Sequence, residues 1–291
     1  MTTADNRQPT LMIVHAHPDD EASQTGGTLA RYSAAGFRTV LVTCTDGGQG
    51  DGTGGVKPGH PAHRPAQIAA RRAQELARSA AALGITDLIQ LGHPDSGMPE
   101  SADAIAPGAF SNLDAEPLVR RLEALMHEYR PDVIVTYPPN GLSHHPDHIR
   151  THELTVTAFD RVRLAGGFDR RHGTAGPLSR SVPKLYYIAV SLSRLKTLRA
   201  LAEGVLEPDA WIPPLEIGVD DDTVTTAVDI SDHWAEKLRA LSAHASQADA
   251  AALLRVLSLS GADERTEEYV RADPPWTGRE REDDLFAGIV A

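Results

Sequence analysis

Short apolar runs alternate with longer amphipathic segments through the first half of the chain. The run at residues 11–15 is too short for a helix, and its almost unbroken apolar character is typical of a strand buried on both faces. Similar runs occur at residues 39–43, 87–91 and 132–136, and apolar residues at helical spacing occupy 66–83 and 116–129. The alternation predicts an α/β fold with a doubly wound, mainly parallel, Rossmann-like sheet and helices on both faces.

The second half of the chain shows a less regular pattern. Residues 185–190 and 223–230 have the composition of strands. Ser231 and Asp232 follow the second of these runs, and we expect them to cap a helix that continues to His244. These elements predict additional strands and at least one further helix against the same sheet.

Two segments of the second half read as loop or surface. Residues 207–214 contain three prolines and predict a loop, and the charged, proline-interrupted stretch at 262–284 predicts a surface segment. We therefore assign residues 1–180 to a Rossmann-like core. Residues 181–291 are assigned to a smaller C-terminal extension that completes the same domain and the wall of its pocket.

Composition narrows the classes of partner. The 291 residues include 40 acidic and 28 basic side chains, a net charge of −12, which repels nucleic acid and anionic membrane surfaces. No apolar run reaches the roughly 18 residues that a membrane span requires, and residues 1–9 lack the pattern of a secretory signal, so we expect a cytoplasmic protein. The one cysteine, Cys44, lies among apolar strand residues and is interpreted as core. The oligomeric state stays open, with a homo-oligomer among the alternatives.

A glycine-rich run suggests a nucleotide site that its context does not support. Gly50, Gly52 and Gly55 match the spacing G-x-G-x-x-G, but the residues that follow contain two prolines and cannot begin a helix promptly. A nucleotide-binding Rossmann protein without hydrolase activity is kept as an alternative. Our preferred interpretation is that residues 47–65 form a loop that acts as a mobile wall or lid over a substrate pocket.

Two clusters of histidine and carboxylate follow predicted strands. Residues 15–21 contain two histidines and three carboxylates, and residues 144–148 contain three histidines and one aspartate. Because the carboxyl ends of parallel strands meet at one edge of a sheet, we expect the clusters to converge. They could supply three ligands to a divalent metal whose fourth position is left to water. A spare aspartate and a spare histidine could then serve as the base and the oxyanion-stabilising group that hydrolysis needs.

The residues of these clusters also carry a family resemblance. HPDDE at residues 17–21 and HPDH at residues 145–148 resemble the paired motifs of the LmbE-like, PIG-L family of metal-dependent N-deacetylases. Further segments in the order of the family are RAQEL at 72–76, DSGM at 95–98, PNG at 139–141 and AHASQ at 243–247. The chain is most similar to the actinobacterial branch that handles mycothiol precursors and conjugates.

The resemblance implies roles for the residues of the paired motifs. Its implied metal ligands are His17, Asp20 and His148, and its implied general base is Asp19. From spacing alone, Asp19 and Asp20 could exchange these roles. The resemblance further implies that His145 is the electrostatic and general-acid partner, and that Asp147 holds the imidazole of His145 in one tautomer.

The resemblance also implies a substrate-binding set. Arg72 and Asp95 would bind sugar hydroxyls. Ser143 stands where the mycothiol enzymes place a tyrosine that assists at the substrate carbonyl. Either another group, such as His144 or the loop from Gly47, supplies that donor, or the substrate binds in a different pose.

We therefore expect a zinc-dependent hydrolase that removes an acetyl or other acyl group from the amine of an N-acetylglucosamine-type sugar or glycoconjugate. Zinc is the expected metal, although ferrous iron and cobalt suit the same ligands. One alternative keeps the metal and cleaves the amide of a mycothiol-like thiol conjugate or secondary metabolite. Another is a metal-stabilised binding protein without catalysis.

Overall fold

The computed structural model describes residues 8–98, 104–171, 178–207, 212–261 and 265–289. The strands are β1 (Thr10–His15), β2 (Arg38–Thr45), β3 (Asp87–His93), β4 (Val133–Thr136), β5 (Phe168–Arg171), β6 (Leu178–Ser181), β7 (Lys184–Ala189), β8 (Thr226–Asp229) and β9 (Thr266–Asp273). The α-helices are α1 (Asp20–Gln24), α2 (Gly26–Ala34), α3 (Pro65–Leu83), α4 (Ala115–Tyr129), α5 (Pro146–Leu164), α6 (Leu192–Val205), α7 (Trp234–Ala243) and α8 (Ala248–Leu257).

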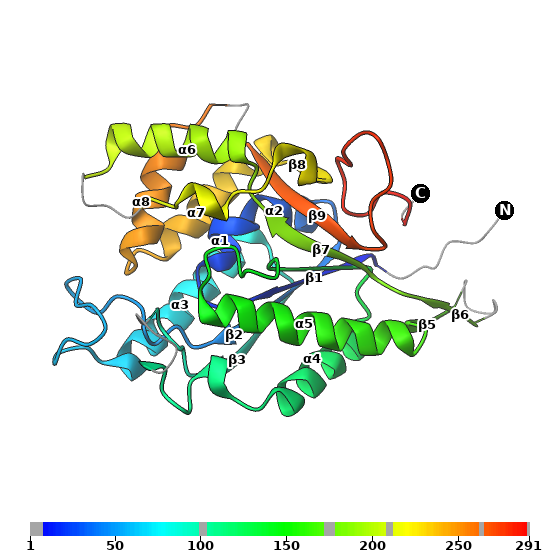
Figure 1. Cartoon of the computed structure of the whole chain (residues 1–291), viewed down its shortest axis with the longest axis horizontal. Coiled ribbons are helices and arrows are strands. Elements are labelled where there is room, and N and C mark those ends of the chain that lie inside the picture. Colours follow the sequence, from blue (N-terminus) through cyan, green and yellow to red (C-terminus); the bar gives the residue numbers. More distant parts are fainter. Residues whose placement is uncertain (1–7, 99–103, 172–177, 208–211, 262–264, 290–291) are drawn as a thin grey trace.

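A seven-stranded sheet in the order β3-β2-β1-β4-β7-β9-β8 forms the centre of the molecule (Figure 1). Each neighbouring pair from β3 to β7 is parallel, whereas β9 pairs antiparallel with both β7 and β8. This confirms the predicted doubly wound and mainly parallel α/β sheet. Strands β7, β9 and β8 continue the sheet beyond β4, so the segment after residue 180 contributes strands to the same sheet as β1. No helix among the described residues is long and apolar enough to cross a membrane.

Strand β1 divides the core into two layers. Leu11 and Ile13 pack in one apolar cluster with α2 and α7, whereas Met12 and Val14 pack in the other with α4 and α5. Side chains that alternate between two apolar layers require a strand apolar on both faces, as its sequence predicts. Figure 1 shows the two layers of helices on opposite faces of the sheet, and Cys44 lies in the buried core as expected.

Two sequence-based expectations about the second half are wrong. Within residues 262–284, Thr266–Asp273 is strand β9, which lies inside the sheet rather than on the surface. Its charged residues Glu267 and Glu268 are buried and accept hydrogen bonds, so charge did not signal exposure. Ser231 and Asp232 form a short 3-10 turn before α7 and give it no side-chain cap. Of the predicted loop at 207–214, residues 208–211 lie outside the described residues.

A buried ion pair joins the C-terminal half to the first helices. Lys237 Nζ lies 2.6 Å from Glu267 Oε1 and donates to the carbonyl of Ser23 at 2.8 Å. The Glu267 carboxylate accepts the backbone N–H groups of Gly27 and Thr28, at the start of α2. We expect Lys237→Met to lower the free energy of unfolding by about 3–5 kcal/mol, because it leaves the Glu267 charge buried without its partner. Urea denaturation followed by circular dichroism measures this change.

The same helix offers a matched control. Arg239 pairs with Glu236 at 2.7 Å, but both side chains are substantially exposed. Arg239→Met should therefore change the free energy of unfolding by less than about 1 kcal/mol. Equal midpoints for the two variants would contradict the structural role given to Lys237.

Candidate metal centre and active site

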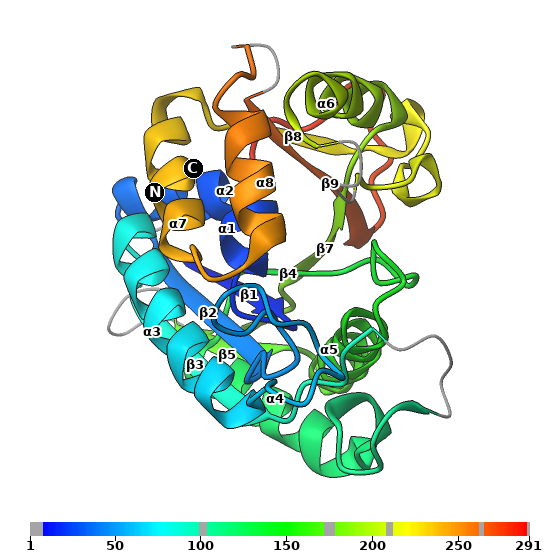
Figure 2. The same cartoon turned by 90° about the vertical axis from the view of Figure 1, so that its left-hand side faces the viewer.

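The two histidine clusters meet at the edge of the sheet where β1 and β4 end. Figure 2 views the molecule from this side. β1 ends at His15 and leads to His17, while the loop after β4 leads to His145, the N-cap of α5. Since β1 and β4 are neighbouring parallel strands, residues about 130 positions apart in the chain come into contact here.

His17, Asp20 and His148 form a triangle of potential ligand atoms. His17 Nδ1 lies 3.1 Å from His148 Nε2 and 3.4 Å from Asp20 Oδ2. His148 Nε2 lies 3.5 Å from Asp20 Oδ1. Three ligands of a tetrahedral ion with bonds of about 2.0–2.1 Å lie roughly 3.3 Å apart. The two nitrogens lie near this spacing from each other, and each lies near it from one of the two Asp20 oxygens, so the three side chains could hold one divalent cation.

The hydrogen bonds around the triangle fix which ring nitrogens face it when the histidines are neutral. His148 Nδ1 is 3.0 Å from the carbonyl oxygen of Gly141, which can only accept, so Nδ1 carries the hydrogen and Nε2 presents a lone pair. His17 Nε2 faces the Asp147 carboxylate at 3.2 Å, so in the neutral ring Nε2 carries the hydrogen and Nδ1 presents a lone pair to the triangle. Two nitrogen lone pairs and the Asp20 carboxylate thus face one another, which is the donor set that a cation satisfies.

Negative charge surrounds His17 on its other side. Its Nε2 is 3.5 Å from Asp95 Oδ1, in addition to the contact with Asp147. Burial lowers the pKa of His17, but the carboxylates of Asp95, Asp147 and Asp20 outweigh it and raise the pKa well above its usual value. The carboxylates therefore favour positive charge at this ring, and a bound cation would compete with protons for it.

Asp147 has a different side-chain partner from the one expected. Its carboxylate accepts from His17 and from the backbone N–H of Ser96, at 3.2 and 2.9 Å, rather than from the ring of His145. The backbone N–H of Asp147, however, donates to His145 Nδ1 at 3.2 Å, because His145 is the N-cap of α5. The main chain of Asp147 thus fixes the tautomer of His145 and leaves its hydrogen on Nε2, while the side chain orients His17.

His145 is held as a neutral ring beside the triangle. One nitrogen from each of His17, His145 and His148 lies within 4.8 Å of the others. Burial, together with the rings of His17 and His148, lowers the pKa of His145 to about 2. Burial also lowers the pKa of His148 to about 4, against the opposing effect of Asp20. Both rings are therefore neutral near pH 7, as a ligand and a hydrogen-bond donor require.

Asp19 precedes α1 in a strained conformation and lines the same pocket. Its φ of 115° is far from the values that side chains favour. Asp19 Oδ2 accepts from Arg72 Nη2 at 2.6 Å. Burial raises the pKa of Asp19 to about 7 although Arg72 opposes the shift. A carboxylate with a pKa near neutrality can accept a proton from water and later release it.

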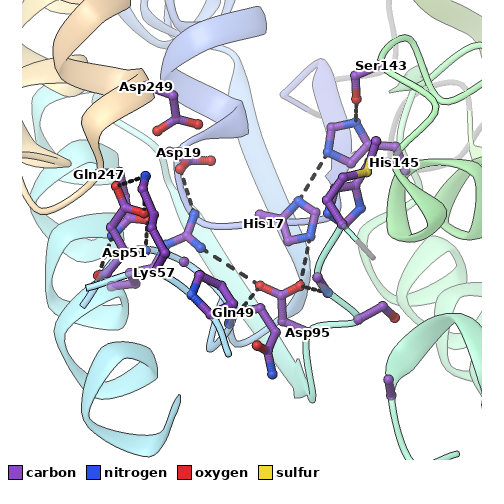
Figure 3. Close-up of a pocket in the computed structure, with 18 of the residues that line it drawn as sticks. His17, Asp19, Gln49, Asp51, Lys57, Asp95, Ser143, His145, Gln247 and Asp249 are labelled. Atoms are coloured by element: carbon purple, nitrogen blue, oxygen red, sulfur yellow. Dashed lines mark hydrogen bonds and ion pairs between the residues drawn. The ribbon is translucent and has the colours of Figure 1, made fainter. Parts of the chain in front are cut away.

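The expected substrate-binding residues line one polar pocket of about 950 Å³. Figure 3 shows Asp19, His17 and Asp95 in this pocket with Ser143 and His145 on one side. Arg72 is buried there, and its Nη1 donates to the carbonyl of Gly47 at 2.9 Å and lies 4.0 Å from Asp95 Oδ2. The structure therefore brings Arg72, Asp95 and Ser143 to the pocket.

Ser143 and His144 differ in how they meet the pocket. Ser143 Oγ lies 3.4 Å from His148 Nδ1, beside the metal-ligand triangle. His144 is exposed and is not among the residues that line the pocket, so it does not replace the tyrosine of the mycothiol enzymes. The loop from Gly47 does reach the pocket, through Gln49 and Lys57.

Gly47 and Gly50 in the loop at 47–65 allow close packing against the pocket, and the context of the loop does not suit nucleotide binding. A Cβ on Gly47 would lie 2.6 Å from Arg72 Nη1, and one on Gly50 would lie 2.3 Å from Gln247 Oε1. After Gly55 the chain makes turns until α3 begins at Pro65, so no helix N-terminus follows the glycine run. The loop therefore forms a wall of the pocket, and a movement as a lid stays a prediction.

Three residues near the site were not singled out from the sequence. Tyr137 follows β4 directly, its hydroxyl donates to Asp20 Oδ2 at 2.6 Å, and its ring stacks on His148 with centroids 4.2 Å apart. Asp249 and Lys57 line the polar pocket. Tyr137 could have been found as the first polar side chain beyond a buried strand. Lys57 lies in the loop at 47–65 that was predicted as a pocket wall, whereas nothing local marks Asp249.

His15, His152, His244 and Glu21 make contacts typical of structural residues. His15 bonds to Tyr137 and Thr25, and His152 contacts the carbonyl of Tyr137, as core residues would. Glu21 is buried and accepts from His244 Nε2 at 2.7 Å, which places His244 behind the pocket instead of in it.

Sequence comparisons identify related proteins over most of the chain. The model of the PIG-L family, described as GlcNAc-PI de-N-acetylase, matches residues 12–159. A 1D-myo-inositol 2-acetamido-2-deoxy-alpha-D-glucopyranoside deacetylase from Kineococcus radiotolerans is 37% identical, with 96% of this chain and 83% of the relative covered. A protein of the same name from Nocardiopsis dassonvillei is 38% identical, with 96% and 100% covered.

Solved structures share the fold at low identity. The N,N'-diacetylchitobiose deacetylase from Pyrococcus horikoshii superposes with a TM-score of 0.55 at 20% identity, covering 89% of this chain and 82% of that one. A 4-carboxy-2-hydroxymuconate hydratase from Pseudomonas putida gives 0.57 at 15% identity, covering 93% and 99%. Because a hydratase shares the architecture, the fold alone does not determine the reaction, which depends on the residues of the site.

Proposed function

We propose, since the chain belongs to the PIG-L family, that it is a metal-dependent hydrolase that removes an acetyl group from the amine of an N-acetylglucosamine-type sugar or glycoconjugate. The observation that carries this proposal is the triangle of His17, Asp20 and His148, whose lone pairs face one another within 3.1–3.5 Å. It lies in the wall of a polar pocket large enough for a sugar.

Zinc is the proposed metal, and His17, Asp20 and His148 are its proposed ligands. Two imidazoles and one carboxylate leave a tetrahedral ion one open position, which is the composition of a catalytic site rather than a structural one. When bound, a divalent cation supplies Lewis acidity that polarises the amide carbonyl and lowers the pKa of water. Ferrous iron and cobalt suit the same donors.

Asp19 and His145 are the proposed catalytic residues. Asp19 accepts a proton from the attacking water, and the same carboxyl group returns it to the nitrogen as the amine leaves. His145 donates a hydrogen bond from Nε2–H to the oxygen that becomes negative. We assign the acid role to Asp19 because His145 Nδ1 accepts the Asp147 backbone N–H, which keeps the His145 ring neutral.

Arg72, Asp95 and Ser143 are the proposed substrate-binding residues. Asp95 offers carboxylate oxygens to sugar hydroxyls, while Arg72 holds Asp19 and the loop at Gly47 in place. Ser143 is too short to replace the tyrosine of the mycothiol enzymes, and Gln49 or Lys57 from the opposite wall could contact the sugar instead. N-acetylglucosamine linked to inositol, which the relatives' names specify, is the first substrate to test.

The test is release of free amine by protein loaded with stoichiometric zinc. We expect turnover of N-acetylglucosamine linked to inositol, and loss of turnover after chelation with recovery on adding zinc. Hydrolysis of a thiol conjugate but not of any N-acetylated sugar would favour the amidase alternative. Binding of a dinucleotide without amide hydrolysis would favour the nucleotide-binding alternative.

A further inference from the structure

A second cavity, of about 320 Å³, adjoins the metal-ligand triangle. Its wall is largely aliphatic, with residues from α6, α8, the loop before α5 and the segments that flank α6. Its apolar members include Leu142, Leu195, Leu198, Ala202, Leu253 and Val256. Apart from the groups that it shares with the polar pocket, its polar lining residues are Ser23, Gln24 and Arg199, so the wall as a whole favours an apolar occupant.

The polar pocket and the apolar cavity meet at the catalytic groups. Both are lined by Asp19, Asp20, Ser143, His148 and Asp249. An amide whose carbonyl lies at this junction has two substituents, which extend in different directions. The nitrogen carries the sugar, which the polar pocket suits, and the carbonyl carbon carries the acyl chain, which faces the apolar cavity.

The size of the cavity exceeds what an acetyl group needs. At roughly 30 Å³ for each water in the liquid, 320 Å³ corresponds to about ten water molecules. A single methyl group fills only a small part of this volume. A chain of several methylenes would instead bury its apolar surface against Leu198 on α6 and Leu253 on α8.

Resting on the proposed function, we propose that this cavity binds the alkyl chain of N-acyl groups longer than acetyl, so that the substrate class extends to amino sugars with medium-length N-acyl chains. The reaction is the same amide hydrolysis: water adds to the carbonyl, the C–N bond breaks, and the products are a carboxylic acid and the free amine. The cavity would determine which acyl groups are hydrolysed with the highest kcat/KM.

A chain-length series tests this inference. The substrates are methyl glycosides of glucosamine acylated with acetyl, butyryl, hexanoyl or octanoyl groups, and the protein is zinc-loaded. We expect kcat/KM to rise by up to about fourfold for each methylene that is buried, until the cavity is filled. A steady fall from acetyl to octanoyl would overturn the inference. So would an equal gain for the octyl glycoside of N-acetylglucosamine, which would show that the cavity takes the aglycone.

Substitutions on α6 connect the selectivity to the cavity. Ala202 is 5% exposed and lines it, whereas Ala200, on the same helix, is exposed and does not. In Ala202→Phe the ratio of octanoyl to acetyl kcat/KM should fall at least tenfold, and in Ala200→Phe it should stay at the wild-type value. Leu198→Ala widens the cavity and should shift the preferred acyl chain to a greater length. This variant tests the inference independently if Ala202→Phe does not fold.

The outcomes separate the two proposals. If wild-type protein releases acetate but the ratio does not respond to Ala202→Phe or Leu198→Ala, this inference fails and the proposed function stands. If zinc-loaded protein hydrolyses none of the N-acyl sugars, acetyl included, the proposed function itself fails.

Discussion

Asp19→Asn should reduce kcat for deacetylation by about 10²–10⁴-fold while leaving the fold intact. The amide retains the size of the carboxylate and one hydrogen-bond acceptor for Arg72, which donates to Asp19 Oδ2 at 2.6 Å. It cannot, however, accept a proton from water or return one to the leaving nitrogen. Steady-state kinetics with an N-acetylated sugar, together with the thermal midpoint and the zinc content of the variant, measure this effect.

Asp249→Asn is the matched comparison. Asp249 lines the same pocket and adds negative charge near Asp19, but it belongs to α8 and is exposed to solvent. Its loss should reduce kcat far less than the loss of Asp19. Similar losses in the two variants would indicate that the charge of the pocket, and not proton transfer at Asp19, governs the rate.

The catalytic edge of the sheet could be predicted because its determinants are local in the sequence. The strand before His17 and the strand before the HPDH motif are short, apolar runs, and the neighbouring histidines and aspartates mark where they end. Parallel strands place such ends together, so the meeting of the two clusters follows from the pattern. The choice of His17, Asp20 and His148 within them came from the family resemblance. Spacing could not distinguish Asp19 from Asp20, since that choice depends on where each side chain points after a residue with φ of 115°.

Other features depend on partners distant in the chain, which no local pattern reveals. Strand β9 has a charged sequence, but Glu267 and Glu268 can be buried because they accept hydrogen bonds from α2 and from the segment before α6. The apolar cavity is assembled from α6, α8 and the loop before α5, whose apolar residues read individually as ordinary core. Asp147 likewise bonds to His17, about 130 residues away, although the motif suggests a bond to its neighbour His145.

Loss of His148, the proposed metal ligand, should have the second large effect, and two histidines on one helix provide the contrast. His148 Nε2 faces His17 Nδ1 at 3.1 Å, whereas His152, one turn further along α5, contacts the carbonyl of Tyr137. His148→Ala should lose stoichiometric zinc and, with it, nearly all turnover, because two ligands remain where a catalytic site commonly has three. His152→Ala should keep both the zinc and most of the activity, at some cost in stability.

Metal content after dialysis against a weak chelator, measured by atomic absorption, distinguishes ligation from general damage to the helix. In wild-type protein, stronger chelation should abolish turnover, and added zinc should restore it. In His148→Ala, added zinc should restore little turnover. Only Asp20 and His17 remain to bind the ion, and their weak binding is not overcome by a higher zinc concentration. Full zinc occupancy and normal turnover in His148→Ala would contradict the assignment of the triangle as the metal centre, since His145 would then be the third ligand instead.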